Sequence, residues 1–300
     1  MLKLHWTAEY PLLLKKFLKQ QGVSRRLLAR LKFHEGKILV NGQLTPVNYQ
    51  LAVGDEVTVV LPPEGKQPDI LPISYPLDIL FEDEHYIVVN KPAGYTSLPS
   101  SYNPQGSLAN MLKAYYIDQG YDNQVIHVVT RLDRDTSGAM LFAKHRYAHS
   151  LIDHVVTHQA IEKRYLALTK VPLAAKTGQI AAPIARKPGS IIERCVSETG
   201  KRAITSYALR EETPLYMAYD VWLHTGRTHQ IRVHFSHAGA PLIADDLYGG
   251  PPSPWLGRQA LHCAKLKFTH PLTGDTLSLK APLPADLKNF LAAGQKAQAR

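Results

Sequence analysis

The 300-residue sequence contains only two cysteines, Cys195 and Cys263. Two thiols cannot build a disulfide framework or a four-cysteine zinc site, and sparse cysteine is typical of a reducing compartment. No stretch approaches the ~20 consecutive apolar residues that a membrane span needs, and the N-terminus lacks the pattern of a secretion signal. The glycine-rich motifs of nucleotide-binding folds, Gly-x-Gly-x-x-Gly and Gly-x-x-x-x-Gly-Lys-Ser/Thr, are also missing. We therefore expect a cytoplasmic protein that does not associate with membranes.

What the sequence has in excess is positive charge. Thirty-five Lys and Arg residues face 25 Asp and Glu residues, which gives a net charge of +10. The charge is densest in residues 1–63, with nine basic against four acidic residues. A balance of this sign favours polyanionic partners, nucleic acid first, although a basic protein without such a partner is the alternative.

Prolines divide the chain into two parts. Residues 61–76 contain Pro62, Pro63, Pro68, Pro72 and Pro76, which neither a helix interior nor a central strand tolerates. We predict a small domain over residues 1–63, a proline-rich linker over 64–77 and a larger domain over 78–300.

The small domain is predicted to combine two helices with short strands. Apolar residues recur at helical spacing in residues 12–18 and again in 27–31, where Ser24 can cap the second helix. The stretches KILV and DEVTVV are typical of strands, and Asn41-Gly42 is a turn signal. Four basic residues would project from the second helix: Arg25, Arg26, Arg30 and Lys32. They favour contacts with nucleic acid, with a solvated helix face as the alternative.

The larger domain is predicted to be rich in strands. Candidate strands include YIVV, AMLFA, RYLALT, ITSYAL and YDVWL, and residues 145–159 show helical spacing. The fold class that we expect is α+β: a mixed, largely antiparallel sheet with flanking helices, preceded by the small α/β domain.

A charged turn, RLDRDTSG, separates two of these strands at residues 131–138. Asp, Thr, Ser and Gly suit an ordinary turn, and Asp135 in particular is expected to cap the backbone amides of Thr136 and Ser137. Asp133 and Asp135 are nevertheless two like charges close together, and they need a cation or hydrogen bonds nearby. The segment TGRTHQIRVHFSHAG can supply the cation Arg232 from the start of a helix that Thr228 would cap. His229 and His234 are five residues apart, a spacing that disfavours a metal site, so we expect both to be structural hydrogen-bonding groups.

Residues 12–43 resemble the S4 RNA-binding module, whose pattern is an apolar helix, Ser-Arg, and then Gly-x-Ile/Val-x-Val-Asn-Gly. The resemblance implies binding to structured RNA, with the four basic residues named above as phosphate contacts. Three further motifs resemble the RluA-type RNA pseudouridine synthases: RLDRDTSG, TGRTHQIRVH and LIADDLYG. An N-terminal S4 module agrees with that architecture.

This second resemblance implies an enzyme that isomerises uridine to pseudouridine in RNA without a metal or other cofactor. It makes Asp133 the essential carboxylate, Arg232 its ion-pair partner and Tyr165 the aromatic ring against the uracil. Leu261 and Arg131 would line the substrate pocket. Asp133 would either attack C1′ of the ribose or remove a proton from the sugar.

Two positions depart from the family pattern. Thr130 stands where the family usually has His, which is expected to alter hydrogen bonding beside the charged turn. Ala244 stands where Gly usually precedes Asp, and we expect the lost conformational freedom to be unnecessary.

Two other functions are alternatives to a pseudouridine synthase. A non-catalytic RNA-binding or ribosome-assembly factor is disfavoured by the intact Asp133, Tyr165 and Arg232. A nucleosidase or glycosidase would need a second carboxylate across the scissile bond. We expect a monomer that acts on ribosomal large-subunit RNA, with transfer RNA as the alternative.

Overall fold

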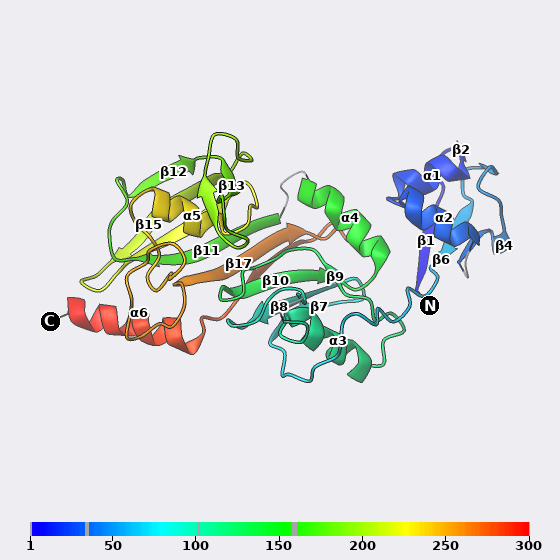
Figure 1. Cartoon of the computed structure of the whole chain (residues 1–300). Helices are drawn as coiled ribbons and strands as arrows, with labels where there is room; N and C mark the ends of the chain where they lie inside the picture. Colours follow the sequence, from blue (N-terminus) through cyan, green and yellow to red (C-terminus); the bar gives the residue numbers. More distant parts are fainter. Residues whose placement is uncertain (1, 34–35, 101–102, 158–160, 300) are drawn as a thin grey trace.

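The computed structural model of the chain describes residues 2–33, 36–100, 103–157 and 161–299, without the side chains of residues 32, 33 and 153–157. The first sixty or so residues form a small sheet with two helices, which lies at one end of the molecule (Figure 1). The four strands pair antiparallel in the order β1 (Lys3–Thr7), β6 (Glu56–Val60), β3 (Lys37–Val40) and β4 (Gln43–Leu44). The helices are α1 (Leu14–Gln20) and α2 (Arg25–Phe33), and two short strands, β2 (Leu12–Leu13) and β5 (Gln50–Leu51), form a separate pair.

Local signals explain the helices and strands of this small unit. The Ser24 hydroxyl accepts a hydrogen bond from the backbone N–H of Leu27 at 3.2 Å, so Ser24 caps α2 as predicted. Asn41 and Gly42 have φ angles of 51° and 79°, which a two-residue hairpin turn between β3 and β4 requires. Both predicted helices and both predicted strands are confirmed, whereas β1, β2 and β5 are additional strands.

The larger sheet occupies the middle of the molecule. Its strands follow the order β12-β15-β16-β11-β17-β10-β8-β7, with β18 paired to β17 and β9 to β10. Among the described pairs, β10 and β17 run parallel and the others run antiparallel, so the predicted mixed, largely antiparallel sheet is confirmed. The strands are β7 (Ile79–Glu82), β8 (Tyr86–Lys91), β9 (His127–Val128), β10 (Ser137–Ala143), β11 (Ile161–Thr169), β12 (Thr177–Ala181), β15 (Ile204–Glu212), β16 (Met217–Leu223), β17 (Leu261–Thr269) and β18 (Thr276–Lys280).

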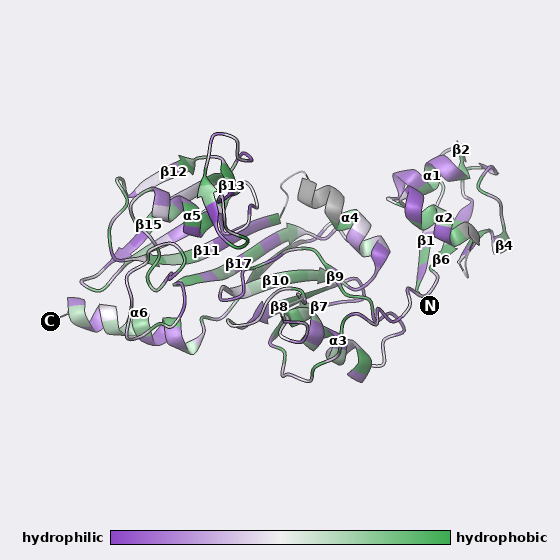
Figure 2. Ribbon diagram, viewed as in Figure 1, coloured by the Kyte–Doolittle hydropathy of each residue, from purple (hydrophilic) through white to green (hydrophobic). Residues whose placement is uncertain are grey.

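Helices cover this sheet. They are α3 (Leu108–Asp118), α4 (Arg146–Thr157), α5 (Gln230–His237) and α6 (Ala285–Gln298), and a separate hairpin of β13 (Ile184–Arg186) and β14 (Arg194–Val196) packs near α5. Successive residues of β11 face opposite sides: Tyr165 belongs to the main core, and Leu166 packs with α6. Every residue of β10 is buried, and hydrophobic residues gather along the central strands (Figure 2).

The proline-rich segment predicted as a linker has no helix or strand between residues 61 and 78. It is nevertheless packed against the larger unit, because Ile70 is 5% exposed and belongs to the main hydrophobic core. Two hydrogen bonds fix its C-terminal part. The backbone N–H of Ile73 donates to Asn110 O at 3.1 Å, and the side-chain amide of Asn110 donates to Leu71 O at 2.7 Å.

Within the described ranges, none of the helices is long and apolar enough to cross a membrane. The same residues contain no group of three or more His, Cys, Asp or Glu side chains that could hold a metal ion.

Candidate active site

The charged turn lies in the long loop between β9 and β10, and backbone contacts from segment 91–97 hold it. The Ser97 hydroxyl accepts from the N–H of Leu132 at 3.0 Å and donates to the carbonyl of the same residue at 2.7 Å. The N–H of Gly94 donates to the carbonyl of Arg134 at 3.1 Å. Both sides of Asp133 in the chain are therefore fixed by neighbours that are distant in sequence.

Lys91 is a second anchor of this loop. Its fully buried ammonium donates to three carbonyls, those of Pro92, Tyr95 and Arg134, at 2.7–2.8 Å. Burial lowers the pKa of Lys91 to about 7, although Asp135 and Asp133 favour the charged form. The three carbonyls use the three donors of the ammonium, so Lys91 ties the charged turn to the segment after β8.

The glycine that ends the motif has a packing reason. Gly138 has φ +118°, and it is the second residue of β10, where it pairs with Cys263 of β17. A Cβ atom at this position would lie 2.3 Å from the carbonyl oxygen of Cys263, a distance that no side chain can adopt. The charged turn can therefore enter the parallel pair of strands only through a glycine.

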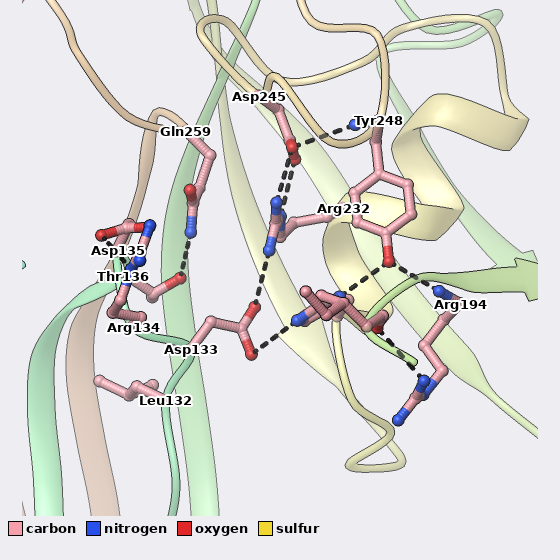
Figure 3. Close-up of polar contacts among 12 residues, drawn as sticks. Leu132, Asp133, Arg134, Asp135, Thr136, Arg194, Arg232, Asp245, Tyr248 and Gln259 are labelled. Carbon is pink, nitrogen blue, oxygen red and sulfur yellow. Dashed lines mark hydrogen bonds and ion pairs between the residues drawn. The ribbon is translucent and has the colours of Figure 1, made fainter. Parts of the chain in front are cut away.

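Arg232 joins two carboxylates, Asp133 and Asp245 (Figure 3). Its Nε and Nη2 donate to the two oxygens of Asp245 at 2.8 and 2.7 Å, while Nη1 lies 3.7 Å from Asp133 Oδ2. Burial would lower the pKa of Arg232, but the hydrogen bonds and charge of Asp245, together with Asp133, raise it. Asp245 thus holds the guanidinium in place, and one edge is left to face Asp133.

His229 faces the same carboxylate from the other side. Its Nε2 lies 4.0 Å from Asp133 Oδ1, and its Nδ1 lies 2.8 Å from the Tyr248 hydroxyl. That hydroxyl accepts the backbone N–H of Arg194 at 2.9 Å and can donate its own proton to His229 Nδ1, an arrangement that assigns the imidazole proton to Nε2. Burial lowers the pKa of His229, with Asp133 opposing the shift. A neutral His229 therefore presents an N–H to Asp133.

These side chains line a cavity of about 1100 Å³. Tyr165, Leu261 and Arg131, all singled out from the sequence, lie in its wall together with Asp133 and Arg232. Tyr165 and Leu261 are buried at 4% and 3% exposure, whereas Arg131 is exposed at the mouth. Small-molecule sites span roughly 300–1,000 Å³, so this cavity can admit a nucleotide that is still attached to a larger molecule.

Four residues of the site were missed by sequence reasoning: Lys163, His229, Asp245 and Tyr248. Lys163 lines the cavity, and burial lowers its pKa against the attraction of Cys263 and Asp133. The other three lie inside the motifs TGRTHQIRVH and LIADDLYG, so those motifs were the available signal. Neither histidine spacing nor charge alone could pair them with Asp133.

Two local expectations prove wrong. Asp135 does not cap the amides of Thr136 and Ser137; its carboxylate accepts from the guanidinium of Arg134 at 2.9–3.2 Å, near the surface. Thr228 does not cap α5, which begins one residue after His229, a residue in the left-handed conformation at φ 57°. The expected structural hydrogen bonds are present at both histidines: His229 bonds to Tyr248, and His234 bonds to Thr205 and Ala182.

The two departures from the family pattern have different consequences. Thr130 is buried, and its hydroxyl accepts the N–H of Leu141 at 3.0 Å, which pins the start of the loop to β10. Ala244 has φ 58°, a left-handed conformation that glycine adopts without strain, so alanine is accommodated here at a cost in backbone strain.

The basic residues predicted to contact RNA lie on α2 in the small unit. Arg25 and Arg26 are exposed, and Arg30 is half-buried with its guanidinium 3.4 Å from the carbonyl of Pro63. The side chain of Lys32 lies outside the described part of the chain. The three arginines do not line the cavity around Asp133.

Fold, motifs and cavity define one class of protein. The family described as RNA pseudouridylate synthase matches residues 85–237, which is half of the chain. The chain belongs to this family of enzymes, which isomerise uridine to pseudouridine in RNA.

Characterised and uncharacterised relatives align over most of the chain. The uncharacterized RNA pseudouridine synthase YjbO of Bacillus subtilis is 43% identical over 277 residues, which cover 92% of this chain and 97% of the relative. The ribosomal large subunit pseudouridine synthase D of Xylella fastidiosa is 38% identical, covering 86% and 81%. The protein of the same name from Escherichia coli O157:H7 is 34% identical, covering 85% and 82%.

A solved structure agrees with the fold. Human RNA pseudouridylate synthase domain containing 4 superimposes with a TM-score of 0.60 at 22% identity. The superposition covers 72% of this chain and 92% of the human one.

Proposed function

We propose that Asp133 is the catalytic carboxylate with which this pseudouridine synthase isomerises uridines in structured RNA. The observation that carries the proposal is the position of Asp133 inside the cavity, with its carboxylate 3.7 Å from Arg232 Nη1 and 4.0 Å from His229 Nε2. Its side chain is 24% exposed, so a nucleotide can reach it.

The reaction requires one bond to break and another to form. The N1–C1′ bond of uridine is cleaved, the uracil turns while held, and C5 joins C1′; a proton leaves C5 and one is added at N1. Asp133 serves either by attacking C1′, which gives a covalent ester, or by removing a ribose proton, which gives a glycal. In both cases the carboxylate must point at the sugar, and Arg232 and His229 flank it at 3.7 and 4.0 Å.

Tyr165 is proposed to hold the detached base. Its ring lies in the cavity wall, and base–aromatic stacking contributes about 1–3 kcal/mol per base in single-strand complexes. Burial raises the pKa of Tyr165 well above its usual range, so the phenol stays neutral beside Asp133. Leu261 and Arg131 complete the proposed pocket, Leu261 against the base and Arg131 at the phosphate-facing mouth.

The proposed substrate is ribosomal large-subunit RNA, with transfer RNA as the alternative. Two relatives that cover more than four fifths of the chain carry that substrate in their names. Residues 1–63 are proposed as an S4-like RNA-binding domain that contacts phosphates through Arg25, Arg26, Arg30 and Lys32, followed by the 64–77 segment and a catalytic domain over 78–300. The protein is proposed to act as a monomer, and its expected cytoplasmic location stays a prediction.

Pseudouridine mapping tests the proposal. Total RNA from a source strain that lacks this gene is incubated with the purified protein, and adduct stops in reverse transcription locate new pseudouridines. We expect defined sites in large-subunit RNA with the wild-type protein and none with Asp133→Asn. New sites that persist with Asp133→Asn would reject Asp133 as the catalytic group.

A further inference from the structure

The small unit packs directly against the catalytic unit and is not connected to it by a flexible linker alone. Tyr147, on α4, is 1% exposed and belongs to the same hydrophobic cluster as the small unit's core residues Leu14, Phe17 and Leu18. Its hydroxyl donates to the carbonyl of Gln21 at 2.7 Å, and its ring meets Trp6 edge-on with centroids 6.2 Å apart. One core therefore spans the two units.

The contact between α4 and the loop after α1 is close. Leu151, one turn further along α4, packs against Gly22, where an added Cβ atom would lie 2.2 Å from Leu151 Cδ2. Gly22 has φ +79°, so its backbone favours glycine, and the Leu151 side chain occupies the space beside it. The two units are therefore in direct van der Waals contact at this point.

Glu64 fixes the other end of the connection. Its carboxylate is 9% exposed and accepts the backbone N–H of Arg146, the first residue of α4, at 2.5 Å. The same carboxylate lies 2.8 Å from His127 Nε2. Burial alone would raise the pKa of Glu64, but His127 and Arg146 lower it to about 2. The segment that leaves the small unit thus caps the helix on which that unit sits.

The segment after Glu64 is also held. Gln67 Oε1 accepts the N–H of Ile126 at 2.8 Å, and Ile70 enters the main core. A chain fixed at these points cannot act as a flexible spacer, which would let the two units sample many separations.

We propose that α4 and the Glu64 segment hold the basic small unit at a fixed position relative to Asp133, and that this spacing selects the RNA. This inference rests on the proposed function. The substrate class it names is a folded RNA that presents a phosphate-rich feature to α2 and an accessible uridine to the cavity at the same time. A second contact at a matched distance raises effective concentration, and it does nothing for RNA in which the two features are wrongly spaced.

The test compares Tyr147→Ala with Tyr10→Ala. Tyr10 is a half-exposed tyrosine of the small unit outside the shared core, so the same substitution there is a matched control. Small-angle scattering without RNA should give one compact shape for the wild type and Tyr10→Ala, and a larger radius of gyration for Tyr147→Ala. Limited proteolysis within residues 61–76 should be faster in Tyr147→Ala alone. Where Tyr147→Ala fails to fold, Leu151→Ala supplies the same comparison.

The RNA measurement uses the same total RNA as the mapping experiment, together with a short stem-loop that carries one mapped uridine. We expect Tyr147→Ala to modify the wild-type sites at least about tenfold more slowly in the long RNA and the stem-loop at an unchanged rate. A scattering curve of the wild type that requires independently moving units would overturn the docking. Wild-type rates at the same sites in the variant would overturn the spacing role. If the wild type modifies no RNA, the proposed function fails, and scattering still decides the docking.

Discussion

Arg232 contacts Asp245 through two hydrogen bonds of 2.7 and 2.8 Å but keeps a distance of 3.7 Å from Asp133. The arginine is therefore positioned by one carboxylate and available to another. Asp245 is almost fully buried, whereas Asp133 is partly exposed in the cavity. This asymmetry separates Asp245, which holds Arg232, from Asp133, which we propose to be the catalytic acid.

The first prediction concerns Asp133, the proposed catalytic carboxylate. Asp133→Asn keeps the shape of the side chain but removes its charge, so we expect pseudouridine formation to fall by at least about three orders of magnitude, as for loss of a catalytic nucleophile. RNA affinity should change little. Asp135→Asn is the matched control, because Asp135 pairs with Arg134 near the surface. Equal losses in the two variants, measured by single-turnover pseudouridine formation in the RNA, would contradict the assignment.

The second prediction concerns Asp245, whose carboxylate holds Arg232. Asp245→Asn leaves the buried Arg232 without its bidentate partner, and breaking a buried ion pair costs about 3–5 kcal/mol. We expect urea unfolding to show a loss of this order. Asp246→Asn, at the exposed neighbouring position, should leave the unfolding free energy within about 0.5 kcal/mol of the wild type. Similar unfolding curves for the two variants would show that Asp245 does not hold Arg232.

His229 is expected to position the carboxylate of Asp133. His229→Leu removes the Nε2–H donor, and loss of one preorganised donor reduces kcat by about 10²-fold or more. His229→Gln retains an N–H at a similar reach and should recover most of that loss, with KM unchanged in both variants. A purely structural role would instead change stability in proportion to side-chain volume, without rescue by Gln.

A substitution at Ala244 tests the free-energy cost of the left-handed backbone conformation before Asp245. The left-handed conformation costs a non-glycine residue about 1–2 kcal/mol, and glycine costs about 0.4–1 kcal/mol through the entropy of the unfolded chain. Ala244→Gly is thus expected to stabilise the protein by about 0.5–1 kcal/mol in urea unfolding. Ala238→Gly, at the C-cap of α5 with φ −79°, lacks the strain and should destabilise. A loss of stability in Ala244→Gly would contradict the argument.

His145 makes stability depend on pH. Burial, together with His85, lowers its pKa from 6.5 to about 3, and its Nδ1 accepts the N–H of Ala148 in the first turn of α4. Above pH 6.5 the folded and unfolded states are both neutral at this site. Below it only the unfolded state gains the proton, so stability falls as the pH drops from 6.5 towards 3.

The size of this effect can be measured. His145→Asn keeps a capping acceptor and removes the titration, so the slope of the unfolding free energy between pH 6 and 4 should decrease by up to about 1.4 kcal/mol per pH unit. His5→Asn, at an exposed position, is the control and should leave the slope unchanged.

Sequence reasoning predicted the fold where the signals are local. Ser24, the Asn41-Gly42 turn and alternation along β11 specify helix start, hairpin and strand from a few neighbouring residues. Charge made Arg232 a candidate cation for the charged turn, and the motif resemblance paired it with Asp133. The two residues are about a hundred positions apart in the sequence, and that separation does not indicate how close they lie in the fold.

The parts that were missed depend on long-range contacts. Asp245 and Tyr248 act through Arg232 and His229, and only the folded loops bring these pairs together. Ala244 shows the same limit at one residue: its left-handed φ is imposed by the loop around it, where Ala244 N donates to Pro251 O at 2.8 Å. The proline-rich segment was predicted without regular structure, but composition could not reveal that Ile70 enters the core.

The contacts of Lys91 and Ser97 with the loop around Asp133 affect the free energy of RNA binding. Because the backbone on both sides of Asp133 is already ordered by Lys91, Gly94 and Ser97, the substrate does not have to arrange the reacting group. Ordering a loop residue on binding would consume about 1–2 kcal/mol of interaction free energy. Phosphate and stacking contacts are left free to drive the uridine out of its helix, a step that itself requires a few kcal/mol.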